Sequence, residues 1–78
     1  NPTHYRKPGQ MEVIDQMMTL YGLDAVKSFC ICNAYKYRMR AGLKQGQPIE
    51  QDIQKARWYE AMALYLDGMG DDPREGAY

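Results

Sequence analysis

Apolar residues recur at intervals of three and four positions in separate stretches of this 78-residue sequence. That spacing places them on one face of an α-helix. The first stretch predicts a helix over residues 11–21, which Gly22 ends because glycine readily adopts a left-handed backbone. The second predicts a helix over about residues 23–41, with Gly42 as its stop.

A third helix is predicted from Pro48 to Leu66, because proline fits the first position of a helix. It carries two apolar faces, although a helix in a three-helix monomer needs only one. We expect the second face to be buried against another copy of the chain; the alternative is one wide face covered by the N-terminal residues. The first face comprises Ile49, Ile53, Ala56, Ala63 and Leu66, and the second comprises Trp58, Met62 and Tyr65.

These elements predict an all-α fold: a small three-helix protomer that assembles into a homo-oligomer. Strand patterns are absent from the sequence, and a single domain of this length has a thin core that self-association can supplement. Residues 1–10, with two prolines, predict an extended N-terminal arm before a helical core over residues 11–66. Residues 67–78 are rich in glycine and acidic side chains and predict a flexible tail.

Charge is balanced overall, at 10 basic and 10 acidic residues, but it is unevenly distributed. Residues 1–44 carry seven basic and three acidic side chains, and residues 45–78 carry three and seven. Such asymmetry can mark a site for an anion. Alternatively, the two halves attract each other within the fold or between subunits.

Cys30 and Cys32 are too few and too close together for a disulfide framework. Residues two apart on a helix point away from each other, so we expect two reduced thiols, as in a cytosolic protein. No apolar run approaches the roughly 20 residues that span a membrane, and no secretory leader is visible. We therefore expect no membrane partner.

The densest chemical signal is a basic, tyrosine-rich segment of the second helix. Lys36 and Arg40 are four residues apart and share a helix face, which Asn33 and Tyr37 flank. An anion between the two cations would relieve their repulsion, and tyrosine rings can stack on a base or sugar. We interpret this segment, with Lys44, as a site for a phosphorylated nucleotide. A solvated basic face is the alternative, and zero net charge disfavours nucleic acid.

Other candidate chemistry is weaker. His4 is a lone histidine in the arm, where it could close over a ligand. Glu12 and Asp15 share a helix face as in Mg²⁺-binding motifs, but no second such motif follows, so we predict no metal site. The sequence also lacks a P-loop, a G-x-G-x-x-G motif and zinc-ligand spacing.

The order of several short motifs resembles a family of short phage proteins related to nucleotide kinases. It also resembles the C-terminal region of a nucleotide kinase of short-tailed coliphages that lacks a P-loop. The string N-x-x-K-Y-x-x-R-A-G-x-K over residues 33–44 is the most specific of these motifs. The resemblance covers about residues 3–66 and implies a phage protein of the host cytoplasm with a nucleotide site. The nucleotide-binding residues that it implies are His4, Tyr5, Asn33, Lys36, Tyr37, Arg40, Lys44 and Tyr59, with Asp52 nearby.

Three functions follow as hypotheses. The first is a nucleotide-binding sponge that sequesters a phosphorylated or cyclic nucleotide, such as an immune signalling molecule, without a resident cofactor. The second is a kinase of nucleoside monophosphates, since the resemblance implies phosphorylation of dTMP and dGMP, and it would need ATP and Mg²⁺. In this hypothesis the phosphates are bound by a basic patch that consists of Lys36, Arg38, Arg40 and Lys44, and Asp15 or Asp52 binds a metal or orients an acceptor hydroxyl. The third is a protein-interaction module with no small ligand.

Overall fold

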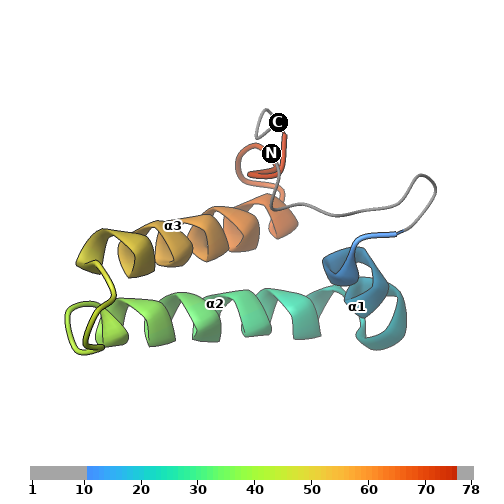
Figure 1. Ribbon diagram of the computed structural model, residues 1–78. Coiled ribbons are helices and arrows are strands. Elements are labelled where there is room, and N and C mark those ends of the chain that lie inside the picture. Colours follow the sequence, from blue (N-terminus) through green and yellow to red (C-terminus); the bar gives the residue numbers. More distant parts are fainter. Residues whose placement is uncertain (1–10, 76–78) are drawn as a thin grey trace.

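A computed structural model of the chain describes residues 11–75, and within that range it contains three α-helices and no strand. The helices are α1 (Val13–Tyr21), α2 (Leu23–Arg40) and α3 (Ile49–Leu66). As Figure 1 shows, α2 and α3 lie side by side and antiparallel, and α1 crosses the end where α2 begins and α3 ends. The predicted all-α class and the three helices are therefore confirmed.

A glycine with a left-handed backbone separates α1 from α2. Gly22 has φ of 93°, and its backbone N–H donates to the Met18 carbonyl oxygen at 3.0 Å. A side chain at this φ would be strained, because a Cβ atom crowds the neighbouring carbonyl. Gly22 therefore ends α1 as predicted and lets the chain turn directly into α2.

The connection between α2 and α3 contains a second left-handed glycine, Gly42, with φ of 83°. A Cβ atom built on Gly42 would lie 3.4 Å from two side-chain carbons of Ile49, so the turn is also closely packed. Pro48 precedes α3 with an extended ψ of 138°, and the helix begins at Ile49, one residue later than predicted. Proline caps this helix rather than opening it.

The core is small and lies where α1 meets the hairpin of α2 and α3. Ile14, Val26, Cys30 and Met62 form its buried cluster. Farther along the hairpin, the small Ala34 and Ala56 are buried, so α2 and α3 pack closely there. The buried α2 residues lie four apart, as the predicted stripe requires.

The prediction that Trp58, Met62 and Tyr65 face another subunit is wrong for Met62. Its side chain is 0 % exposed and belongs to the cluster to which α1 contributes Ile14. Trp58 is half-buried against the same cluster. Tyr65 is the most exposed of the three, at 36 %. Met62 and, in part, Trp58 therefore pack within the chain itself, in the cluster formed with Ile14, Val26 and Cys30.

The basic and acidic halves of the chain attract each other within the fold, as one of the two charge interpretations proposed. The Lys27 ammonium lies 2.7 Å from the Asp67 carboxylate. Arg38 of α2 donates a hydrogen bond to Glu60 of α3 at 2.9 Å. Arg38 therefore has a carboxylate partner and lies apart from the rest of the predicted basic patch.

The segment after α3 contacts α1. Arg74 donates to the Asp15 carboxylate at 3.0 Å and to Asp72 at 2.7 Å, and it lies 3.5 Å from Glu12. Its guanidinium lowers the pKa of Asp72. Asp72 is 9 % exposed. These contacts of the predicted acidic tail were not expected from the sequence, and the division into arm, core and tail remains a prediction.

Both cysteines are free thiols, as predicted. Cys30 is buried in the core and Cys32 is exposed, and burial raises the pKa of the Cys30 thiol. Among residues 11–75, no helix is long and apolar enough to cross a membrane.

Candidate functional site

Three cations converge on one aromatic ring between α2 and α3. The Lys36 ammonium lies 4.5 Å from the centroid of the Tyr37 ring, and the Arg40 guanidinium carbon lies 4.9 Å from it. Lys55 of α3 adds a third cation at 5.4 Å. Cations at these distances are attracted by the negative face of the ring. We call Lys36, Tyr37, Arg40 and Lys55 the cation cluster.

Tyr59 of α3 supports the ring of Tyr37. The two rings stack with centroids 5.9 Å apart and planes inclined by 13°. The edge of Phe29 also meets Tyr59, at 5.9 Å and 90°. Burial raises the pKa of Tyr59, and a hydrogen bond with Asn33 opposes that shift. Asn33 and Tyr59 therefore belong to the same site as the cation cluster.

A buried carboxylate holds Arg40 in place. Asp52 is 1 % exposed, and one of its oxygens accepts hydrogen bonds from Arg40 at 2.9 Å and from Gln47 at 2.7 Å. The hydrogen bond from Arg40 lowers the pKa of Asp52, so the carboxylate is ionised at neutral pH. The second Asp52 oxygen and the Arg40 Nε find no partner within residues 11–75. Each member of the pair therefore has one polar atom without a hydrogen-bond partner in the described range.

The lysines around Tyr37 differ from Arg40 in their ion pairs. Neither Lys36 nor Lys55 forms an ion pair with any residue of the described range 11–75. With Arg40 they place three positive charges against the single negative charge of Asp52. Like charges this close repel each other, and a bound anion would relieve that repulsion.

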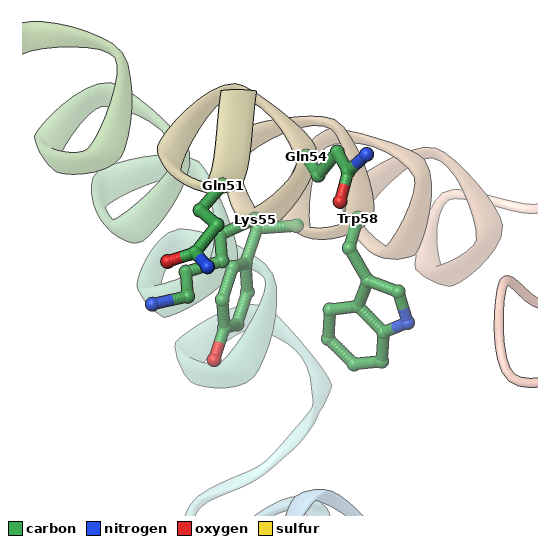
Figure 2. Close-up of a pocket in the computed structure, with 5 residues that line it drawn as sticks. Gln51, Gln54, Lys55 and Trp58 are labelled. Atoms are coloured by element: carbon green, nitrogen blue, oxygen red, sulfur yellow. The ribbon is translucent and has the colours of Figure 1, made fainter. Parts of the chain in front are cut away.

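A hollow of about 420 Å³ adjoins the cation cluster. Its lining includes Gln51, Gln54, Lys55 and Trp58 of α3, and Figure 2 shows Trp58 across from Gln51 and Lys55. Tyr59 completes the lining. Lys55 and Tyr59 thus belong to both the hollow and the surroundings of Tyr37.

The structure brings together Asn33, Lys36, Tyr37, Arg40 and Tyr59 from the predicted set. Lys44 is exposed in the loop after α2, where its charge helps to lower the pKa of Asp52. It makes no described contact with Tyr37. The predicted residues His4 and Tyr5 lie outside the described residues.

Sequence reasoning missed Lys55 and the glutamines as site residues. Gln51, Lys55 and Tyr59 are spaced by four and therefore share a helix face, so the pattern was present. This spacing did not indicate a site, because it does not tell which α2 residues the face contacts. Trp58 was assigned to an apolar stripe for the same reason.

The predicted E-x-x-D pair of α1 is occupied by a cation of the chain itself. Arg74 lies between Glu12 and Asp15, as described above. Within residues 11–75, no three histidine, cysteine or acidic side chains are grouped as a metal site would require. Glu12 and Asp15, at the start of α1, therefore have a structural role as partners of Arg74.

Comparison with known proteins places the chain among phage proteins. The family described as "Protein of unknown function (DUF3310)" matches residues 1–61. The "Gene 1.7 protein" of Enterobacteria phage T3 is 30% identical over 63 residues, which cover 80% of this chain and 39% of that relative. The "Nucleotide kinase gp1.7" of Escherichia phage T7 is 32% identical over 62 residues, covering 78% and 32% respectively. The chain thus spans only 39% and 32% of the lengths of these two relatives, and no solved structure matches it.

Proposed function

The chain belongs to the DUF3310 family, and from that premise we propose that it binds a phosphorylated nucleotide at the cation cluster. The observation that carries this proposal is the convergence of Lys36, Arg40 and Lys55 on the Tyr37 ring. The resemblance and the residue chemistry were independent grounds for a nucleotide. Lys55 adds a cation that neither of them had included.

The cluster suits a phosphate group for electrostatic and geometric reasons. Lys36 and Lys55, which form no ion pair within residues 11–75, supply point charges, and Arg40 supplies a guanidinium held by Asp52. Charge-assisted hydrogen bonds to phosphate are stronger than neutral ones. Because Lys36 and Lys55 are exposed, we expect their contribution to weaken at high salt.

Sequestration is the first use that we propose for this site. A sponge holds its nucleotide unchanged, so it needs only affinity, which the cations and aromatic rings supply. The ligand class then includes cyclic and linear phosphorylated nucleotides, because the cluster recognises phosphate charge in either form. A homo-oligomer could place such sites between subunits.

A nucleotide kinase is the second candidate, and the printed name of the T7 relative favours it. Phosphoryl transfer depends mainly on positioning and on stabilising charge, and the cation cluster offers both. In this case Lys36 and Arg40 would hold the phosphates of a nucleoside monophosphate. ATP and Mg²⁺ would then be needed. Arg38, which pairs with Glu60, is not part of this second proposal.

One experiment separates the two candidates. Purified protein is mixed with nucleoside monophosphates and cyclic dinucleotides, with and without ATP and Mg²⁺; free ligand is removed by filtration, and the protein is denatured by heat. Chromatography of both fractions then shows the fate of each nucleotide. Intact ligand released by heating supports sequestration, and a new phosphorylated product supports the kinase. If every nucleotide stays in the filtrate unchanged, both candidates are wrong.

Substitution of the lysines tests the site itself. Lys36→Gln and Lys55→Gln should each weaken nucleotide binding on the order of 10- to 100-fold, as expected for a lost hydrogen bond to a charged group. Neither lysine has an ion-pair partner in the described chain, so thermal stability should stay close to wild type. Isothermal titration calorimetry measures the affinity.

Arg57→Gln is the matched control, because it removes one exposed positive charge from the same helix outside the cluster. Equal weakening by Arg57→Gln and Lys55→Gln would show that only net charge matters. The proposed phosphate site would then be rejected.

A further inference from the structure

The hollow beside the cation cluster has the composition of a nucleobase site. We propose that it is the base subsite of the nucleotide site, with the base stacked on Trp58 and its edge read by Gln51 and Gln54. This inference rests on the proposed function, since the cation cluster positions the phosphate. It adds the location of the base and the residues that determine which base is preferred.

The two subsites are joined by shared residues. Lys55 lines the hollow while its ammonium lies 5.4 Å from the Tyr37 centroid. Tyr59 also lines the hollow while its ring stacks on Tyr37. A nucleotide carries its phosphate and its base at opposite sides of one sugar, so a single molecule can occupy both subsites. The volume of about 420 Å³ lies within the range of small-molecule sites.

Trp58 is held in a position suited to stacking. Its ring meets Tyr59 edge to face, with centroids 5.0 Å apart and planes at 82°. The indole also packs against the core cluster, which restricts its rotation, yet it is only half-buried and lines the hollow. An aromatic face that is fixed and accessible can stack on any base. Trp58 therefore supplies affinity for bases in general.

Gln51 and Gln54 supply selectivity between bases, which stacking on Trp58 does not provide. Each amide has both donors and an acceptor, and the edge of each base presents its own pattern of these groups. Both glutamines are exposed, and neither side chain hydrogen-bonds any residue within the described chain. The amides are therefore available to a ligand, and together with Trp58 they favour a planar heterocycle over a plain sugar phosphate.

Trp58 is the single tryptophan of the chain, so its fluorescence reports on this hollow. We would titrate the protein with the nucleoside monophosphates of the common bases and with ribose 5-phosphate, and measure both heat and fluorescence. Nucleotides should quench Trp58 and bind more tightly than ribose 5-phosphate, which should bind without quenching. If neither kind of ligand binds, the proposed function fails. If both bind equally and without quenching, only the base subsite is rejected.

Substitutions add a second measurement. Trp58→Leu should weaken nucleotide binding about 5- to 100-fold while changing ribose 5-phosphate binding less than about twofold. Because Trp58 contacts the core, Trp58→Phe serves as a second variant that keeps an aromatic ring and should lose less affinity. Equal losses for nucleotide and ribose 5-phosphate would overturn the stacking role.

Substitution of the glutamines tests base recognition without disturbing the fold, because both side chains are exposed. Gln51→Ala and Gln54→Ala should change the ratio of affinities between purine and pyrimidine nucleotides several-fold. Gln45→Ala is the control, because Gln45 is an exposed glutamine in the loop before α3 and outside the hollow. An unchanged ratio in both variants would overturn the assignment of base recognition to these amides.

Discussion

Asp52 is more deeply buried than any other acidic or basic side chain within residues 11–75. Its carboxylate accepts hydrogen bonds from Arg40 and Gln47 and so ties the end of α2 to the start of α3. A buried charge is costly unless it is paired, and removing one member of such a pair strands the other. Asp52 is therefore a positioning residue, which fixes the Arg40 guanidinium beside the Tyr37 ring.

Asp52→Asn should lower both thermal stability and nucleotide affinity at pH 7, because Arg40 loses its charged partner. The folded-state pKa of Asp52 lies below the ordinary value of about 3.9. The carboxylate therefore stabilises the fold above pH 4, and this contribution is lost as the pH falls through the folded-state pKa. Thermal unfolding of wild type and variant should differ at pH 7, and the difference should shrink as the pH falls below about 3.9, the ordinary pKa of an aspartate.

Asp71→Asn provides the control for this residue-scale prediction, since Asp71 is an exposed acid beyond α3. It should leave unfolding and binding unchanged. A variant Asp52→Asn that melts like wild type at pH 7 would show that the buried carboxylate is dispensable.

At the scale of elements, α1 completes a core that the hairpin of α2 and α3 leaves open. Met62 of α3 is fully buried in a cluster with Ile14 of α1, and Arg74 ties the segment after α3 to the same helix. The end of the hairpin farthest from the cation cluster is thus stabilised by two separate kinds of contact. The shape of the site depends on this packing, because Trp58 rests on the same cluster.

Met62→Ala should destabilise the fold by about 2–5 kcal/mol, the usual cost of truncating a buried methionine. A domain of this length has a total stability of roughly 4–12 kcal/mol, so the loss is a large fraction. Urea unfolding measures the change. Met69→Ala truncates a methionine that is 62 % exposed, and it should cost far less. Equal effects of the two substitutions would contradict the packing described for α3.

At the scale of the whole molecule, the other flank of the hairpin carries an apolar surface. A hollow of about 490 Å³ lies there, and its apolar side chains include Ile31, Tyr35 and Leu64, each at least half exposed. Arg38 and Glu60 form part of the same lining, so the surface contains both signs of charge. A surface of this kind can pair with itself about a two-fold axis, and the Arg38–Glu60 ion pair adds no net charge that would oppose such pairing. We propose a second copy of the chain as its occupant.

Sedimentation velocity across a range of protein concentrations tests this homo-oligomer. Ile31→Lys and Leu64→Lys should shift the population toward the monomer, because each buries an unpaired charge in the proposed interface. Leu43→Lys is the control, as Leu43 is 79 % exposed in the loop outside this surface. A wild-type monomer at every concentration would overturn the proposal.

The sequence by itself determined the features that depend on residues close together along the chain. The three helices, the turn at Gly22 and the separation of Cys30 from Cys32 follow from local backbone preference and helical spacing. The same spacing grouped Lys36 with Arg40, and the motif over residues 33–44 indicated the phage relatives that comparison then identified.

Only the tertiary structure decided which helix faces meet. It brought Lys55 and Tyr59 to Tyr37, buried Met62 among Ile14, Val26 and Cys30, and paired Arg38 with Glu60 on the opposite flank. Helical spacing assigns a residue to a face of its own helix, but it leaves the rotation of that helix against its neighbours open. That rotation is set by contacts between residues far apart in sequence, through the packing of a few small and apolar side chains.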